Sequence, residues 1–155
     1  MKMVRDRMIC TDFWSNPIFL GEANMTTEDK YFYIYLLTNP HTNEIGIYQI
    51  SKKLMAFELN YSIEHVHLLM ERFIEHHKLI RYNPEKRELA IKNWGKHNLY
   101  KVSKPVLDCI FSELKDVEDP SLIPFVSESI QNQEIRRLYE SFDVYTNERE
   151  HENRY

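Results

Sequence analysis

Glycine is scarce in this sequence, which has only Gly21, Gly46 and Gly95 among its 155 residues. Phosphate-binding loops of the Walker or Rossmann type need closely spaced glycines, so neither motif is present. Two cysteines, Cys10 and Cys109, form no disulfide framework, which makes a reducing cytoplasm the expected compartment. No apolar run approaches the ~20 residues of a membrane helix, and the N-terminus leads into no long apolar segment, so we expect no membrane span and no signal peptide.

The sequence also lacks the residue spacings typical of metal binding and catalysis. Helical metal ligands lie three or four residues apart, whereas His65 and His67 are two apart and His76 adjoins His77. His67 and Glu71 have the right spacing but no evident third ligand. No Ser-His-Asp or Cys-His set is apparent. We therefore expect no metal, no cofactor and no enzymatic activity.

What is present is a globular composition with an uneven charge distribution. Hydrophobic residues make up 43% and charged residues 28%, a balance typical of a folded domain rather than of a disordered chain. The net charge of −4 divides into −2 for residues 1–48, +5 for residues 49–104 and −7 for residues 105–155. A polyanionic partner would therefore bind the middle of the chain, unless both ends are simply solvated.

The stretch 45–91 has the pattern around which the chain is organised. Ser51 and Ser62 can each cap a helix, and Asn60 can end the first of these two helices. A polar turn then separates two short apolar segments. The predicted elements are a strand ending at Ile47–Ile50, helices Lys52–Leu59 and Ser62–Lys78, and strands Leu79–Tyr82 and Glu88–Ile91 joined by the turn Asn83–Arg87. This order is that of a winged helix-turn-helix.

We therefore predict an α+β, mainly helical fold, a winged helix-turn-helix with N-terminal and C-terminal extensions. The expected winged-helix domain covers residues 1–117 and the acidic, partly helical extension covers residues 118–155. The flanking elements predicted are a strand at Met8–Thr11, a single turn at Pro17–Leu20, a helix from Thr26 to Asn39 that includes the aromatic run Tyr31–Leu37, a helix from Lys104 to Asp119, a linker at Ser121–Pro124, a helix at Ser129–Phe142 and a frayed tail from Asn147.

The second central helix has an apolar and an acidic side. Its inward stripe has spacings of three and four residues and comprises Ile63, Val66, Met70, Phe73 and His77. Its outward side carries Glu64, Leu68, Glu71 and Glu75. In a helix-turn-helix that reads duplex DNA, this helix enters the major groove, where carboxylates are repelled by phosphate. Direct reading of a base sequence by this helix is therefore not expected.

Cations and aromatics cluster instead around the hairpin. Lysines mixed with aromatic side chains suit sequence-tolerant contact with phosphates and unstacked bases. The alternative is a solvated basic wing with Trp94 packed against the flank of the domain. The candidate nucleic-acid-binding residues are Lys52, Lys53, Arg72, Lys86, Arg87, Lys92, Trp94, Lys96, Tyr100 and Lys101.

Four separated segments resemble the N-terminal domain of DnaD-like phage replication proteins, which occur in phages and prophages of Gram-positive bacteria. The segments are Met8–Trp14, Tyr35–Asn43, Gly46–Tyr48 and Ile91–Asn98, and the similarity extends from about Arg7 to Leu114. The resemblance implies a winged helix with extra elements that acts in primosome or replisome organisation. In that family the N-terminal module is associated with self-assembly and protein contacts, and DNA binding is credited largely to a C-terminal helical domain. After Leu114 too little of this sequence remains for such a domain.

The expected function is that of an accessory protein in phage or prophage DNA replication initiation, in the cytoplasm of a bacterial host. It would form a homo-oligomer through its N-terminal segment and aromatic helix, bind DNA weakly and non-specifically, and contact replication proteins such as a helicase loader. One alternative is a winged-helix transcriptional regulator that binds a specific operator. A second is an adaptor that binds only proteins.

Overall fold

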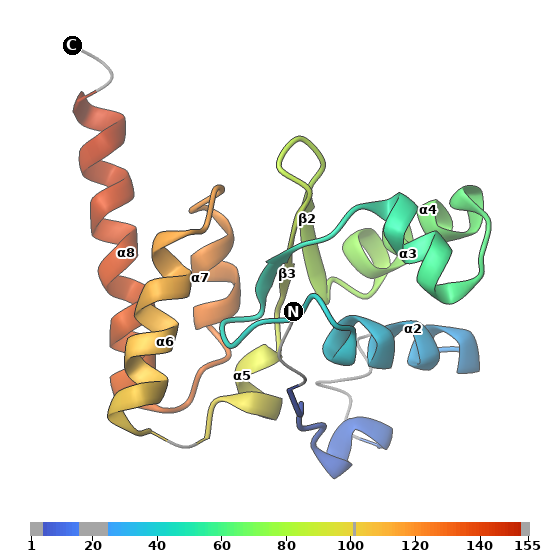
Figure 1. Cartoon of the computed structure of the whole chain (residues 1–155), viewed down its shortest axis with the longest axis horizontal. Coiled ribbons are helices and arrows are strands. Elements are labelled where there is room, and N and C mark those ends of the chain that lie inside the picture. The colour runs from blue at the N-terminus through green and yellow to red at the C-terminus, as the bar shows by residue number, and fades with distance from the viewer. Residues whose placement is uncertain (1–4, 16–24, 101, 153–155) are drawn as a thin grey trace.

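The computed structural model describes residues 5–15, 25–100 and 102–152 and confirms the predicted α+β, mainly helical class. The predicted turn at Pro17–Leu20 lies outside the described residues. A small sheet lies between two groups of helices, α2 to α4 on one side and α6 to α8 on the other (Figure 1). The elements are η1 (Thr11–Trp14), α2 (Thr27–Thr38), β1 (Ile47–Gln49), α3 (Lys52–Leu59), α4 (Ile63–Glu71), η2 (Arg72–His76), β2 (Ile80–Asn83), β3 (Glu88–Ile91), α5 (Trp94–Asn98), α6 (Lys104–Lys115), α7 (Leu122–Ser127) and α8 (Gln133–Glu152).

The sheet is antiparallel with the strand order β1-β3-β2, and its hairpin matches the prediction. Tyr82 and Tyr48 both lie opposite Leu89, one on each side of the central strand. The turn between β2 and β3 is held by the Asn83 side chain, which accepts hydrogen bonds from the backbone N–H groups of Glu85 and Lys86. Local side-chain capping of this kind is why a polar Asn-Pro turn between two apolar segments predicts a hairpin.

Both predicted helix caps in the central stretch are confirmed. The Ser51 and Ser62 hydroxyls each accept a hydrogen bond from the backbone N–H three residues later, at 3.1 Å. Asn60 ends α3 in the left-handed conformation, with φ of 57°. The second helix differs in one respect, because its last turn, η2, is π-helical and the His77 N–H donates to the Arg72 carbonyl. The helix then stops at Lys78, which has a φ of 54°.

The aromatic segment is helical, as the capping box predicted. Thr26 and Asp29 satisfy each other's backbone N–H groups at the start of α2, each at 3.1 Å. Phe32 and Tyr33 are buried and meet the ring of Phe73 edge to face, with centroids 5.1 and 5.8 Å away. Most of the aromatic run therefore packs in the core as part of a helix, although aromatic residues on their own also favour strands.

The strand predicted at Met8–Thr11 is wrong. Residues 5–10 form no regular element, and the 3-10 helix η1 begins at Thr11. The backbone donors of this segment are satisfied by side chains rather than by a neighbouring strand: Met8 N–H donates to Asn98 and Cys10 N–H to the Nδ1 of His97. β-propensity alone cannot distinguish these outcomes, because they depend on residues nearly ninety positions away.

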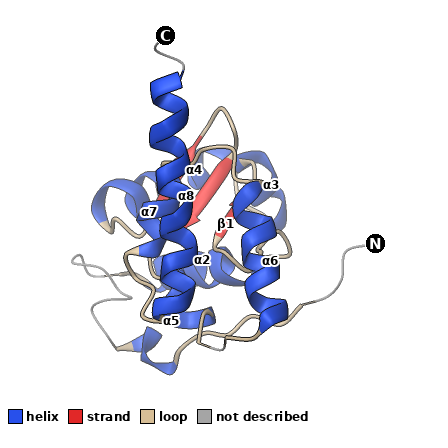
Figure 2. Ribbon diagram, turned by 90° about the vertical axis from the view of Figure 1, so that its left-hand side faces the viewer, coloured by secondary structure: helices blue, strands red, loops and turns tan. Residues whose placement is uncertain are grey.

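The linker predicted at Ser121–Pro124 is also wrong, because α7 occupies most of it. Pro124 lies in the first turn of α7, where a proline removes no helical hydrogen bond. Figure 2 views the molecule from the α6 and α8 side, with the strands behind these helices. The predicted C-terminal extension shares the hydrophobic core of the rest of the chain, to which it contributes Leu122, Ile123, Val126, Ile130, Ile135 and Tyr139.

The last helix extends further than expected. Asn132 caps it by accepting the N–H groups of Glu134 and Ile135, and Tyr139 donates from its hydroxyl to the Ile45 carbonyl at 3.0 Å. The backbone stays helical through Glu152, whereas a frayed tail was expected from Asn147. The hydrogen bond of Tyr139 ties α8 to the loop that leads into β1.

A close contact between Gly46 and Trp94 generates the first prediction. Gly46 has a φ of 74°, and a Cβ atom placed there would overlap Cγ and Cβ of Trp94. Replacing Gly46 with Ala should lower the free energy of unfolding by about 3 kcal/mol, since overpacking and positive-φ strain add. The measurement is urea unfolding followed by circular dichroism. The opposite exchange, Lys78→Gly, is the control and should change the unfolding free energy by less than about 1 kcal/mol. A Gly46→Ala variant as stable as the parent would contradict the close contact.

His97 generates a second prediction, about acid stability. It is completely buried on α5, and this burial lowers its pKa from 6.5 to about 4. The unfolded chain therefore takes up a proton first as the pH falls from 6.5, and unfolding becomes easier by up to about 3 kcal/mol at pH 4. The variant His97→Asn keeps an acceptor for Cys10 without a titrating ring. Its stability should fall less steeply between pH 6.5 and 4.

The carboxyl groups of Glu88 and Glu113 change the acid stability in the opposite direction to His97. Burial raises the pKa of Glu88 and of Glu113, so the folded state takes up their protons first as the pH falls. Both groups are still present in His97→Asn, and their effect cancels when the two stability curves are subtracted. Parallel curves for the parent and the variant would show that His97 contributes nothing to acid sensitivity.

Candidate nucleic-acid interface

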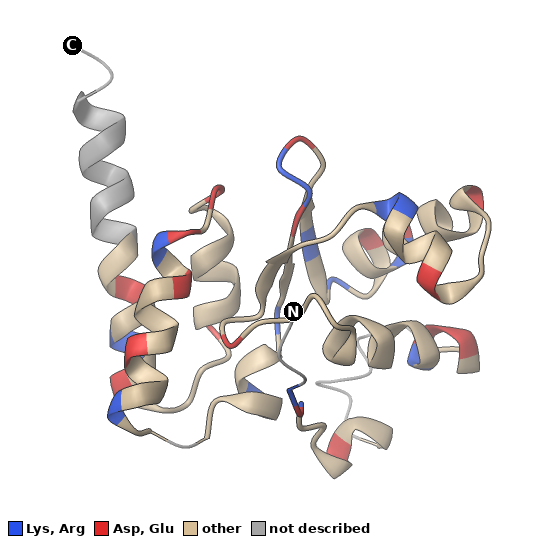
Figure 3. Cartoon of the chain, viewed as in Figure 1, with Lys and Arg blue, Asp and Glu red and all other residues tan. Residues whose placement is uncertain are grey.

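The hairpin turn presents two exposed cations on a well-supported backbone. Lys86 and Arg87 are both exposed, while the Arg87 carbonyl accepts the N–H of Ile50 at 2.8 Å. Tyr82 braces the same region by donating from its hydroxyl to the Ile50 carbonyl. Figure 3 shows the projecting loop with basic residues on one side and an acidic residue at its tip. Glu85, which precedes Lys86 in the sequence, is exposed as well. The loop can therefore offer positive charge at a defined position.

The other candidate cations differ in solvent exposure and in their contacts. Lys53 is exposed on α3, whereas Lys52 is half-buried, with its Nζ 3.1 Å from Nδ1 of His67 and 5.7 Å from the centre of the Tyr82 ring. Lys92 and Lys96 are half-buried beyond β3. Tyr100 is exposed, and Lys101 lies outside the described residues.

Trp94 does not belong to this surface. Its side chain is completely buried, and its indole N–H donates to the Glu44 carbonyl at 2.7 Å. The guanidinium of Arg7 lies 5.7 Å from the ring centre. No face of the indole is left to stack on a base, so the alternative expectation of a tryptophan packed within the protein describes its position.

Arg72 is paired within the protein, although its side chain is 39% exposed. Its Nη2 lies 2.6 Å from Oδ2 of Asp29, a carboxylate with no solvent exposure, and Nε2 of His77 lies 3.2 Å from the same oxygen. This cluster joins the start of α2 to the π-helical turn. Sequence reasoning identified Asp29 only as a capping residue, because the residues that converge on it are more than forty positions away.

Sequence reasoning also missed two cations near the hairpin. Arg81 is exposed on β2, with its guanidinium 4.7 Å from the centre of the Phe125 ring, and Lys78 is exposed between η2 and β2. The alternation of β2 could have indicated Arg81, because Ile80 is buried and the next side chain must point to the other face.

The outward ridge of α4 and η2 is acidic, as expected. Val66, Met70, Phe73 and His77 are buried, although Ile63 is 38% exposed and falls outside the predicted stripe. The exposed ridge carries Glu64, Leu68, Glu71 and Glu75. Phosphates would be repelled along this ridge and attracted at the hairpin, which separates two surfaces of opposite sign (Figure 3).

His41 and His65 each lie beside a carboxylate. Nε2 of His41 lies 3.1 Å from Glu58, and Nε2 of His65 lies 2.8 Å from Glu28. Within residues 5–15, 25–100 and 102–152, no group of three or more His, Cys, Asp or Glu side chains could hold a metal ion. The same part of the chain has no helix long and apolar enough to cross a membrane.

Comparison with known proteins gives no relative from which a role could be transferred. No family model, no curated protein and no solved structure matches the chain.

Proposed function

We propose that this chain is a winged-helix accessory protein of DNA replication that binds DNA weakly through its hairpin and binds proteins through other faces. The order α2, β1, α3, α4, β2, β3 and the sheet order β1-β3-β2 support a winged helix-turn-helix. In this proposal α3 and α4 form the helix-turn-helix, and the hairpin of β2 and β3 is the wing.

The observation that carries the proposal is the separation of charge between the wing and α4. The wing exposes Lys86 and Arg87, and Arg81 lies further along the same ribbon. The helix that would enter a major groove instead exposes Glu64 and Glu71. Such a surface favours contact with the phosphate backbone by the wing and disfavours reading of base edges by the helix.

The expected affinity is low. Each neutralised phosphate contributes about −0.9 to the slope of log affinity against log salt concentration, and a handful of contacts gives the non-specific range of roughly 10⁻⁴ to 10⁻⁶ M. Four cations of the proposed site are exposed, namely Lys53, Arg81, Lys86 and Arg87. A protein of this kind needs a partner or a second copy to stay on DNA at physiological salt.

The replication role follows the resemblance to DnaD-like proteins, and the four resembling segments lie close together in this structure. Trp94 of one segment lies against Gly46 of another. Asn39 of a third segment donates from Nδ2 to the Tyr48 hydroxyl at 2.9 Å. Phe13 of the fourth meets Tyr33, 5.3 Å away, and lies 6.4 Å from His97. The four segments thus belong to one core, although Tyr33 itself lies just before the segment that contains Asn39.

Protein contacts are proposed for the faces that expose large apolar side chains. Phe57 on α3 is 83% exposed, Leu68 on α4 is 62% exposed and Tyr31 on α2 is 53% exposed. Solvent-exposed aromatics are typical of interface anchors. The proposed partners are a second copy of the chain and replication proteins such as a helicase loader, in a bacterial cytoplasm.

The wing generates a testable prediction. The double variant Lys86→Ala/Arg87→Ala should weaken binding to a fluorescent 20-base-pair duplex about tenfold at low salt and make the salt slope shallower by about 1.5 to 2. The measurement is fluorescence anisotropy over a salt series. The matched control is Lys115→Ala/Arg137→Ala, which removes two exposed cations from α6 and α8. Equal losses in both double variants would point to net charge alone and overturn the role of the wing.

A second prediction separates this proposal from a transcriptional regulator that reads an operator through α4. If the helix does not touch DNA, neutralising its ridge with Glu64→Gln/Glu71→Gln should change duplex affinity less than twofold at physiological salt. If the helix lies in the groove, removing two repulsive charges should raise affinity many-fold. The same anisotropy titration distinguishes the two results, and a large gain would favour the regulator.

A further inference from the structure

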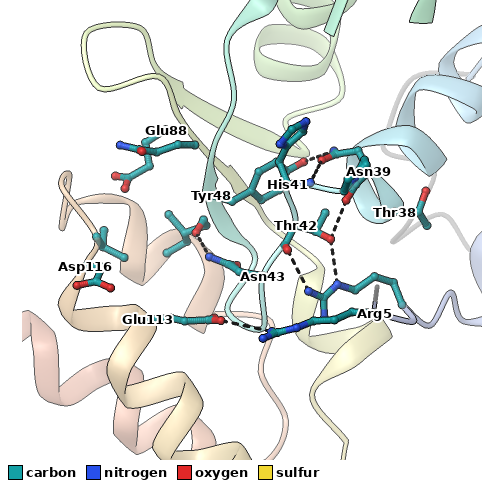
Figure 4. A pocket seen from close by; sticks show the side chains of 15 residues that line it. Arg5, Thr38, Asn39, His41, Thr42, Asn43, Tyr48, Glu88, Glu113 and Asp116 are labelled. Carbon is teal, nitrogen blue, oxygen red and sulfur yellow. Dashed lines mark hydrogen bonds and ion pairs between the residues drawn. The ribbon is translucent and has the colours of Figure 1, made fainter. Parts of the chain in front are cut away.

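A groove of about 740 Å³ runs beside β1 and also reaches Glu88, the first residue of β3 (Figure 4). One wall is the turn that follows α2, and the other is the C-terminal end of α6. Thr38, Asn43, Tyr48, Glu88, Glu113 and Asp116 are among the lining side chains. Figure 4 shows Asp116 and Glu88 on the side of the groove opposite the turn.

The backbone of β1 points its free hydrogen-bonding groups into this groove. The Gly46 carbonyl accepts the N–H of Ile91, and the N–H of Ile50 donates to the Arg87 carbonyl, so residues 46, 48 and 50 face β3. In an antiparallel ladder the residues between them, Ile47 and Gln49, must face the other way. Both of these residues line the groove.

This strand edge is only partly protected. Asn43 donates from Nδ2 to the Ile47 carbonyl at 2.6 Å, which satisfies one of the outward groups. The Ile47 N–H points the same way but belongs to a buried residue, so the accessible outward donor and acceptor of β1 are those of Gln49. Edge strands are normally protected by proline, lysine, a bulge or a covering element. Ile47 is covered by its neighbours, with 2% of its surface exposed, whereas Gln49 is exposed and has none of these protections within the described residues.

The charges of the groove leave one carboxylate uncompensated. Glu88 accepts the N–H groups of Glu118 and Asp119, and Glu113 accepts those of Glu44 and Ile45, so both carboxylates are occupied. At the other end, Arg7 is held by Thr42 and Glu44, and Arg5 lies 4.0 Å from Glu113.

Asp116 is exposed and forms no ion pair with any residue of the described chain. A bound group near Asp116 should therefore be cationic.

We propose that this groove binds an extended segment of a partner protein, which adds to β1 as a fourth strand and places a lysine or arginine beside Asp116. Strand addition uses main-chain hydrogen bonds for affinity and side chains for selectivity. Because β1 is three residues long and Ile47 is buried, the main-chain bonds open to a partner are those of Gln49, and the interaction should be reversible. The proposal does not depend on DNA binding by the hairpin, since it involves the opposite edge of the sheet.

The probe for the test is a fluorescein-labelled, end-blocked octapeptide of alternating valine and lysine. Two comparison peptides replace its lysines by glutamate or methylate every second backbone nitrogen. The full chain should bind the first peptide in an anisotropy titration, and each comparison peptide should bind at least tenfold more weakly. Equal binding of the methylated peptide would overturn strand addition, because methylation removes the backbone donors that it requires.

Two variants of the protein complete the test. Gln49→Pro removes an outward backbone N–H and leaves the hydrogen bonds between β1 and β3 in place. Asp116→Lys reverses the charge of one wall of the groove. Each variant should bind the valine-lysine peptide at least tenfold more weakly than the parent. Asp108→Lys makes the same charge change on α6 outside the groove, and it should stay within twofold of the parent. If Gln49→Pro lowers thermal stability, the comparison of the two α6 variants still decides the outcome.

Two results would overturn the proposal. The first is an equal loss of peptide binding in Asp108→Lys and Asp116→Lys, which would indicate a general charge effect. The second is a parent protein whose sedimentation shows an oligomer larger than the 18.8 kDa monomer and that binds none of the three peptides. In this case the Gln49→Pro variant would be monomeric. A second copy of the chain would then be the occupant of the β1 edge.

Discussion

The contact between Trp94 and Gly46 is the constraint on which the arrangement of this protein depends. The indole occupies the space that a side chain at position 46 would need, and its N–H donates to the carbonyl of Glu44. The same glycine accepts the N–H of Ile91 through its own carbonyl. One aromatic ring thereby holds α5 against the start of β1 and aligns β1 with β3. The hairpin, the groove beside β1 and the packing of α7 all take their positions from that alignment.

Charge is organised in two ways that a composition does not reveal. Buried or half-buried charges connect elements, as the Asp29 carboxylate does when it receives Arg72 and approaches His77. Exposed charges define surfaces, with cations at the hairpin and carboxylates along α4. Because Arg72 belongs to the first group, it does not offset the acidic ridge of the second. The ridge along α4 is consequently more negative than a count of its charged residues in the sequence indicates.

Local signals in the sequence were reliable and distant ones were not. Ser51, Ser62 and Thr26 predicted helix starts correctly because a cap involves residues within one turn. The segment 8–11 failed because its N–H groups are satisfied by side chains of α5. The segment Ser121–Pro124 was predicted as a linker because sequence alone does not show that Pro124 lies in the first turn of a buried helix. The burial of Trp94 and the groove beside β1 arise from tertiary packing, which no local pattern encodes.

The π-helical turn at Arg72–His76 has a consequence for how this chain can vary. A π-helical turn holds one residue more than an ordinary α-helical turn, so deleting a single residue there would convert it to regular α-helix. The strand after Lys78 would then keep its register, with Ile80 still buried and Arg81 still exposed in the pairing with β3. A deletion within β2 would instead exchange the two faces of the strand. Related chains are therefore expected to tolerate a difference of one residue at this turn but not within β2.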